Sequence, residues 1–154
     1  MKRISNIGSL LKKIYRLYSS SILKSLKDKG FTDLRPSFLE VLLYICENSG
    51  GPTIKDIGNA CGLKKQTMTS HLNELESRDY ILRRPNLHDK REQNVFLTES
   101  GEKFKLILFE SIKEIENDFG NKIGNVELDR IQSVLENLYL QLENHNQLQE
   151  RFLT

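Results

Sequence analysis

The sequence has only two cysteines and no long apolar run, and both shortages exclude classes of protein. Cys46 and Cys61 are too few to form the disulfide framework of a small secreted domain. No stretch approaches the roughly 18 apolar residues that a membrane-spanning helix needs. The basic start of the chain is followed by no apolar segment of the kind found in signal peptides. We therefore expect a cytoplasmic protein without a membrane partner.

The sequence also lacks the residue clusters on which catalysis and metal binding depend. His71, His88 and His145 lie far apart, and no group of His, Cys, Asp or Glu has the spacing of a metal site. No phosphate-binding glycine loop, nucleophile elbow or convincing catalytic triad is present. We expect no enzyme activity, no cofactor and no bound metal.

Charge, by contrast, is plentiful and unevenly distributed, although the net charge is only +2. Basic residues predominate in residues 1–30 and again in residues 64–91, whereas acidic residues predominate in residues 98–154. This asymmetry indicates one side that faces a polyanion and another side that faces away from it.

Apolar residues spaced by three and four predict two helices before a break at residues 49–52. The first helix ends at Gly30, and the second begins at Thr32 or Asp33 with Pro36 in its first turn. The apolar face of the first helix is formed by Ile4, Ile7, Leu11, Ile14, Tyr18, Ile22 and Leu26. That of the second is formed by Phe38, Val41, Leu42 and Ile45.

A short helix, a glycine turn and a second helix are predicted after this break. Thr53 with Asp56 resembles a capping box, and it starts a helix over residues 54–60. Gly62 lies in the turn, and the second helix covers residues 65–78. The residues expected to face inward are Ile57 and Ala60 in the first of these helices, and Met68, Leu72 and Leu75 in the second.

Two strands and two further helices complete the chain. Residues 81–84 and 94–97 are predicted to form short strands around a charged loop. Thr98 caps the next helix, and a break falls near residues 120–125. The helix after Thr98 has an apolar stripe formed by Phe104, Leu108, Ile112, Ile115 and Phe119. That of the last is Leu128, Ile131, Leu135, Leu138, Leu142, His145, Leu148 and Phe152, and about three heptads of this kind indicate a partner helix.

The second short helix has the composition expected of a helix that lies in the major groove of DNA. One side is apolar, and the other carries Lys65, Gln66, Thr69, Ser70 and Asn73, with no acidic residue before Glu74. Short neutral or cationic side chains suit this position because phosphates repel acids and base edges require hydrogen-bonding groups. Gln and Asn bond adenine edges in pairs, and Lys favours guanine or phosphate. A solvated amphipathic helix would explain this segment taken alone.

The loop between the strands supports the prediction that this region binds DNA. Arg83, Arg84, Lys90 and Arg91 put four cations on one projecting hairpin. An ordinary surface hairpin has no need of such charge, whereas a wing that lies along phosphates, with an arginine in the minor groove, requires it.

These residues resemble the multiple-antibiotic-resistance regulator (MarR) family of winged-helix repressors. The resemblance runs from about residue 34 to residue 104, with its strongest motifs at Asp89-Lys90-Arg91 and at Leu97-Thr98-Glu99-Ser100-Gly101. It implies a mainly α fold with a small β-wing, a winged helix-turn-helix with N- and C-terminal dimerisation helices. Residues 1–33 and 120–154 would form the dimerisation region, and residues 34–119 would form the DNA-binding domain with its connecting long helix.

The resemblance also implies roles for individual residues. Arg91 would reach the minor groove, and Asp89 would hold it through a charge-assisted bond. The alternative is that the two residues form an exposed ion pair that contributes little to stability. The full set expected to contact DNA is Lys64, Lys65, Gln66, Thr67, Thr69, Ser70, Asn73, Arg83, Arg84, Asp89, Lys90 and Arg91.

Three positions depart from the family pattern. Asp79 stands where Gly is common, and Asp tolerates a left-handed backbone better than most residues. Leu87 replaces a frequent Pro, which predicts a more flexible wing. Lys64 replaces a small capping residue and places positive charge at the positive end of the helix dipole.

The resemblance also suggests regulation by a ligand. Family members often bind a small aromatic or anionic molecule between the dimer helices and the winged domain, which shifts the spacing of the recognition helices. Tyr15, Tyr18, Phe38 and Tyr44 are candidates to line such a pocket, although core packing explains them equally well.

Two other interpretations concern the cysteines and the first helix. Cys61 lies beside Gly62 and near Lys64, which would lower its pKa and suit an oxidant sensor. Both cysteines equally fit the buried, inert state that is commoner for a free thiol. The basic first helix also has the pattern of a membrane-surface helix, but a dimer partner explains its apolar face as well.

The sequence thus predicts a homodimeric, sequence-specific transcriptional repressor that binds a pseudo-palindromic operator in double-stranded DNA. The alternative is a winged-helix protein-interaction module that does not bind DNA.

Overall fold

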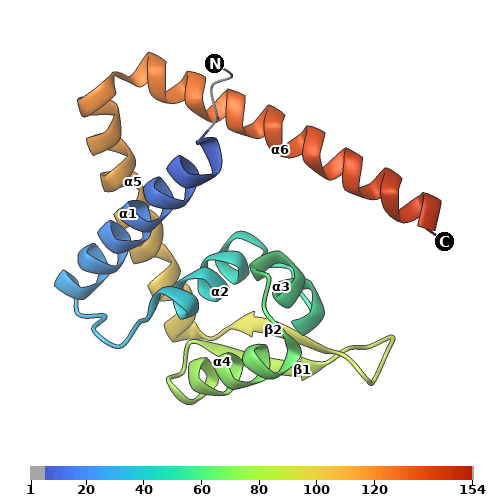
Figure 1. Ribbon diagram of the computed structural model, residues 1–154. Coiled ribbons are helices and arrows are strands. Elements are labelled where there is room, and N and C mark those ends of the chain that lie inside the picture. Colours follow the sequence, from blue (N-terminus) through green and yellow to red (C-terminus); the bar gives the residue numbers. More distant parts are fainter. Residues whose placement is uncertain (1–5, 154) are drawn as a thin grey trace. The chain divides into compact units, whose positions relative to one another are not determined.

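The computed structural model describes residues 6–153, except the side chains of residues 150, 152 and 153. Helices make up most of this part, and an antiparallel hairpin provides its sheet (Figure 1). In chain order the elements are α1 (Ile7–Asp28), α2 (Pro36–Glu47), α3 (Ile54–Cys61), α4 (Lys65–Ser77), β1 (Ile81–Pro85), β2 (Gln93–Leu97), α5 (Glu99–Ile123) and α6 (Asn125–Leu153). The predicted fold class, mainly α with a small β-wing, is confirmed. Ile4 and the side chain of Phe152, both predicted on helix stripes, lie outside the described residues.

Two compact units divide the chain, and α5 runs from the first into the second. The first unit extends to Ile112 and the second begins at Lys113. Gly124, with a φ of 89°, separates α5 from α6 inside the predicted break. Between residues 6 and 153, no helix is both long and apolar enough to cross a membrane.

Local sequence signals start and stop the helices at most of the predicted positions. The hydroxyl of Thr53 accepts a hydrogen bond from the backbone N–H of Asp56, and the Asp56 carboxylate accepts one from the N–H of Thr53, both at 3.1 Å. Gly62 ends α3 in a left-handed conformation with a φ of 64°. The hydroxyl of Thr98 accepts a bond from the N–H of Gly101 at the start of α5.

Two details of the helix predictions are wrong. The second helix begins at Pro36 with Arg35 as its N-cap, and neither Thr32 nor Asp33 starts it. Proline is well suited to the first helical position, and Asp33 is instead engaged by residues that follow α4. Ala60 is exposed on α3, whereas Gly58 is buried beside Ile57, where a side chain would meet Met68.

A core is completed within the first unit. The predicted inner residues of α2 and α4 are all buried, and these two helices pack against α1, α3 and the hairpin. The ring of Phe104 packs edge-on against Tyr80 and Phe31, each at 5.1 Å between ring centroids. The largest fully buried side chains are Phe38, Phe104, Ile22, Leu26, Leu42, Ile45, Ile57, Met68, Leu72, Leu75, Ile81 and Leu108.

The hairpin is attached to the loop between α2 and α3. Its strands pair from Ile81 with Leu97 to Pro85 with Gln93, so each is one residue longer at the tip end than predicted. The backbone N–H of Val95 donates to the carbonyl of Pro52 at 2.9 Å, and a β-bridge joins Thr53 to Asn94. The start of α3 therefore fixes the base of the wing.

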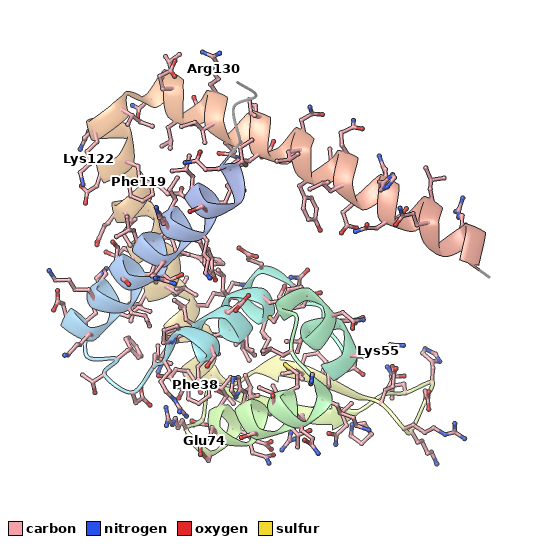
Figure 2. All side chains as sticks on the ribbon, in the orientation of Figure 1. Phe38, Lys55, Glu74, Phe119, Lys122 and Arg130 are labelled. Atoms are coloured by element: carbon pink, nitrogen blue, oxygen red, sulfur yellow. The ribbon has the colours of Figure 1, made fainter. Side chains whose placement is uncertain are left out.

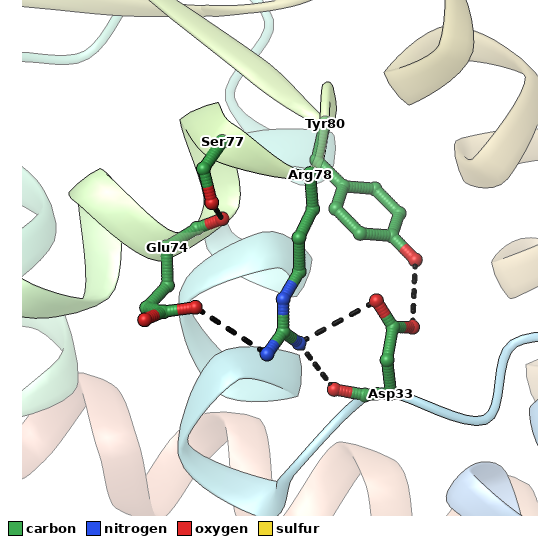
Figure 3. Close-up of polar contacts among 5 residues, drawn as sticks. All are labelled: Asp33, Glu74, Ser77, Arg78 and Tyr80. Atoms are coloured by element: carbon green, nitrogen blue, oxygen red, sulfur yellow. Dashed lines mark hydrogen bonds and ion pairs between the residues drawn. The ribbon is translucent and has the colours of Figure 1, made fainter.

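The C-terminal end of α4 is held by a polar cluster, shown in Figure 3. The guanidinium of Arg78 donates to the backbone carbonyl of Asp33 and lies 3.4 Å from carboxylate oxygens of Asp33 and Glu74. The hydroxyl of Tyr80 donates to the other Asp33 oxygen at 3.3 Å. Burial, together with the neighbouring Asp33 carboxylate, raises the pKa of Tyr80 to about 12. These bonds tie the segment before α2 to the end of α4.

Apolar side chains remain exposed on the first part of α1 and along α6. On α1, Ile22 and Leu26 are buried, but Ile7, Leu11 and Ile14 are exposed. On α6, the exposed apolar residues include Ile131, Val134, Leu135, Leu138, Leu142 and Leu148. Apart from Val134, these residues lie on the stripes that the sequence predicted, and no element of its own compact unit covers either exposed part.

Candidate nucleic-acid interface

Helix α4 has one buried side and one exposed side. Met68, Leu72 and Leu75 are buried, and Phe38 of α2 lies between α2 and α4 (Figure 2). The ring of Phe38 packs edge-on against that of His71. The predicted DNA-facing residues all lie on the exposed side: Lys64, Lys65, Gln66, Thr67, Thr69, Ser70 and Asn73. A surface of short hydrogen-bonding groups is thereby presented on a helix that the core holds in place.

The start of α4 has no side-chain cap. Lys64 is the N-cap residue in an extended conformation, and no side chain accepts a hydrogen bond from the first amides there. The hydroxyl of Thr69 donates to the carbonyl of Lys65 at 2.9 Å, which leaves its oxygen as an acceptor toward the outside. The uncapped N–H groups and the two lysines make this end favourable for an anion.

The sequence did not predict how Arg83 is used. Its Nε donates to Glu76 at 2.6 Å, and its Nη2 donates to the side-chain oxygen of Asn73 at 2.8 Å. Only 21% of the Arg83 side chain is exposed, so it lies back against α4 and does not project from the hairpin. No motif marks Glu76 as its partner, because Glu76 lies in α4 and Arg83 in β1, and the turn between these elements decides which side chains meet.

The wing exposes the other predicted residues, namely Arg84, Asp89, Lys90 and Arg91. The Asp89 carboxylate accepts a hydrogen bond from the backbone N–H of Arg91 at 2.9 Å. The charge-assisted bond between these two residues is thus made to the backbone, and it shapes the turn that carries the Arg91 side chain. Leu87 is 96% exposed in the same loop.

Two asparagines that sequence reasoning missed organise this wing. The side-chain oxygen of Asn86 accepts bonds from the N–H groups of His88 and Asp89, at 2.8 and 3.0 Å. Its amide nitrogen donates to Asn94, and Asn94 donates to the carbonyl of Gly51 at 2.6 Å. Turn chemistry was a signal for Asn86, but nothing local identified the contact of Asn94 with the loop before α3.

Asp79 and Gly51 both have a positive φ, and each lies where the backbone meets another segment. Asp79 adopts a φ of 63°, so the left-handed conformation expected at this position is confirmed. Its carbonyl accepts from the Thr98 hydroxyl and its carboxylate from Ser100, which joins the end of α4 to the start of α5. Gly51 has a φ of 78° and lies against the ring of Phe96, where a side chain would collide.

The predicted low pKa of Cys61 is wrong. Burial, with the nearby Glu40 carboxylate, raises the pKa of Cys61 to about 11, and burial raises that of Cys46 to about 12. Reactive thiols need a lowered pKa, so both cysteines have the environment of inert, packed side chains. Within residues 6–153, no group of three or more His, Cys, Asp or Glu is placed to hold a metal ion.

The four predicted pocket aromatics occupy different environments. Phe38 is fully buried, with the guanidinium of Arg35 4.5 Å from its ring centroid and that of Arg78 at 5.3 Å. Tyr15 is more than half exposed on α1, and Tyr18 and Tyr44 are partly exposed.

Comparisons with known proteins agree with this arrangement. The sequence model of the MarR family matches residues 41–93, which include α4, β1 and most of the wing. The HTH-type transcriptional regulator SarZ of Staphylococcus aureus (strain NCTC 8325 / PS 47) is 33% identical over 79 residues, which are 51% of this chain and 53% of SarZ. The chain thus spans about half the length of the curated relatives that it matches.

Solved structures extend the similarity in fold to most of the chain. A MarR transcriptional regulator from Methanosarcina mazei Go1 superimposes with a TM-score of 0.78 at 20% identity, covering 90% of this chain and 96% of the other. NadR in complex with 4-hydroxyphenylacetate gives a TM-score of 0.73 at 20% identity, covering 90% and 95%. Residues 41–93 are therefore a MarR-family winged helix-turn-helix region, within a chain that has the fold of MarR-family proteins.

Proposed function

We propose that this protein is a sequence-specific DNA-binding transcriptional regulator, a repressor that acts as a homodimer on a pseudo-palindromic operator. The observation that carries the proposal is the pairing of two surfaces in one compact unit. The exposed side of α4 offers short polar groups, and the adjoining wing offers exposed cations. The curated relatives are named as transcriptional regulators.

In this proposal α4 enters the major groove with its N-terminal half toward the bases. The groove is about 12 Å wide and admits one helix, and each base pair presents a distinct pattern of donors and acceptors there. Gln66 and Ser70 lie one turn apart on the exposed side and would read base edges. Lys64 and Lys65, beside the uncapped amides of α4, would bind phosphate.

The wing would follow the backbone into the neighbouring minor groove. Arg91 would enter the groove, and Arg84 and Lys90 would bind the phosphates on its edges. Asp89 would position Arg91 and would not itself contact DNA, because its carboxylate accepts a hydrogen bond from the backbone N–H of Arg91. Each phosphate neutralised by these cations releases counterions, so the affinity should fall steeply with salt.

The exposed stripes of α1 and α6 support a dimer. Apolar side chains at heptad spacing are stable in water when a second helix covers them. Two copies related by a two-fold axis would present two α4 helices to half-sites about one helical turn apart.

A small aromatic or anionic effector fits the same proposal. NadR, which shares the fold, was crystallised with 4-hydroxyphenylacetate. The partly exposed Tyr15, Tyr18 and Tyr44 are the residues that we propose for such a ligand. Phe38 contributes no exposed surface in the single chain, so its main role is in the core.

The experiment is selection of bound sequences from a random duplex pool, followed by titration of the selected duplex at several salt concentrations. We expect a two-fold-symmetric site and an affinity that falls with salt. Arg91→Glu should weaken binding at least ten-fold with the fold and dimer intact, because a carboxylate would face phosphate. Lys122→Glu, which changes the net charge equally at the end of α5, is the control and should bind as the unmodified protein does. The absence of salt-sensitive binding to any duplex would favour a protein-interaction module.

A further inference from the structure

The contact between Arg83 and Asn73 bears on which base α4 recognises. Arg83 is the third residue of β1, and its guanidinium bonds to two residues of α4, Asn73 and Glu76, that lie one turn apart. Asn73 itself is exposed and follows Gln66 and Ser70 along the same side of the helix. An arginine from the wing strand therefore holds a residue of the proposed recognition surface.

The chemistry of arginine fixes which way the Asn73 amide points. A guanidinium has only donors, so the Asn73 atom that lies 2.8 Å from Nη2 must be the carbonyl oxygen. If the amide were flipped, two N–H donors would face each other. The amide nitrogen of Asn73 accordingly points away from Arg83.

Glu76 keeps Arg83 in this position. Its carboxylate oxygen accepts the Nε bond at 2.6 Å and lies 2.6 Å from Nη2 as well. The carboxylate also balances the guanidinium charge within the protein, so Arg83 offers less attraction to phosphate than an unpaired arginine. The exposed Arg84, next in the strand, has no such acidic partner among the described ion pairs.

We propose that Arg83 and Glu76 are a positioning pair that makes Asn73 a hydrogen-bond donor to the DNA. An asparagine that reads adenine uses both amide atoms, with the oxygen accepting from N6 and the nitrogen donating to N7. Arg83 already takes one of the two lone pairs of that oxygen, so the adenine pair expected from the sequence would have to share this atom with the guanidinium, whereas the amide nitrogen has no such competitor. The amide nitrogen instead suits an oxygen acceptor in the major groove, guanine O6 or thymine O4.

The test compares affinities for duplexes that differ only at the base pair read by Asn73. It rests on the proposed function, because it starts from the site selected by the unmodified protein. Asn73→Ala identifies the base pair as the position where discrimination disappears. We expect a discrimination of about five-fold or more in the unmodified protein, the contribution of one hydrogen bond, and a ratio near one in Arg83→Gln at the same base pair.

Asn73→Asp tests the donor role directly. This variant keeps a side-chain oxygen for Arg83 and loses the N–H donors, so we expect it to bind all sites more weakly and to lose the discrimination. A carboxylate can still accept from adenine N6 or cytosine N4. Retained discrimination in Asn73→Asp would therefore overturn the donor assignment.

The dependence of affinity on salt separates a positioning residue from a phosphate contact. Each lost phosphate contact lowers the slope of log affinity against log salt by roughly 0.9. We expect Arg83→Gln to leave this slope unchanged and Arg84→Gln, the matched control, to reduce it with discrimination intact. A reduced slope and preserved discrimination in Arg83→Gln would overturn the proposal.

A further variant tests whether the loss of discrimination comes from a folding defect. Glu76→Gln retains Arg83 but weakens its orientation, so we expect reduced discrimination at the same base pair with an unchanged unfolding temperature. Equal discrimination in Glu76→Gln and the unmodified protein would contradict the pairing. Failure of the unmodified protein to select any duplex would overturn the proposed function itself, which distinguishes the two ideas.

Discussion

The apolar side chains of α2 and α4 are buried within a single chain, whereas those along α6 are exposed. The first group includes Phe38 and Leu72 and is covered by α1, α3 and the hairpin. The second group has the same helical spacing and no covering element in its own compact unit. Periodicity alone does not distinguish these cases, because it reports that a face is apolar and not what covers it.

This difference separates two kinds of stability. A core completed within one chain contributes at any protein concentration, whereas a stripe that needs a second copy contributes only when the copies associate. The proposed DNA-contacting surface is built on the first kind, and the proposed spacing of the two half-sites depends on the second. Variants in each region should therefore differ in what they disrupt.

The largest effect is expected from Leu72→Ala. Leu72 is fully buried on the inner side of α4, and truncating a leucine in such a site costs about 2–5 kcal/mol of unfolding free energy. Chemical denaturation would measure the loss. Ser70→Ala on the exposed side of the same helix should change stability by less than about 0.5 kcal/mol. A small loss in Leu72→Ala would show that this core is not complete in one chain.

A comparable effect of a different kind is expected from Leu138→Glu. Leu138 lies in the exposed stripe of α6, and a charge there would prevent a second helix from packing on it. We expect a monomer by analytical ultracentrifugation and a loss of affinity for the selected duplex of at least about 100-fold, since one half-site contact is lost.

Leu140→Glu is the matched control for that variant. Leu140 is also exposed on α6, but two residues from Leu138 it points to a different side of the helix. It should remain dimeric and bind DNA normally. Equal behaviour of the two variants, whether both dimeric or both monomeric, would count against the stripe as the dimer interface.

A smaller effect should follow from Arg78→Ala, which opens the cluster of Figure 3. Arg78 is partly buried and bonds to Asp33 and Glu74, so its removal takes a donor from the Asp33 carbonyl and from both carboxylates. We expect a loss of about 1–3 kcal/mol by thermal or chemical unfolding. Lys103→Ala, which removes an exposed pair with Glu99, should cost no more than about 0.5 kcal/mol. Similar losses in both would contradict a structural role for the cluster.

The sequence predicted most elements of the fold because their signals are local. Capping by Thr53 and Thr98, the turn at Gly62 and the inner residues of α4 follow from neighbouring residues. The start of α2 was wrong because Asp33, a good capping residue, is used by Arg78 and Tyr80 from a distant segment. Such competition is invisible in a local pattern.

The candidate interface was predicted in composition but not in connectivity. Exposure of the α4 and wing residues agrees with their spacing in the sequence. The bonds of Arg83 to Asn73 and Glu76, and of Asn94 to Gly51, join elements whose relative position only the fold determines. The sequence therefore predicted Arg83 as a DNA contact without indicating its bonds to Asn73 and Glu76.

The smallest effect concerns His71, which lies where the inner and outer sides of α4 meet. Its Nε2 is buried without a hydrogen-bond partner, and burial together with the Arg35 guanidinium lowers the pKa of this imidazole below its usual 6.5. The folded state thus favours the neutral ring, so this contribution to stability is complete above pH 6.5 and is lost as the pH falls below it. Unfolding free energies measured from pH 7.5 to 5 should fall more steeply for the unmodified protein than for His71→Gln, which cannot be protonated there. Parallel curves would mean that water or a protein group reaches Nε2, and the core under α4 would then be less dry than the burial of Phe38 and Leu72 indicates.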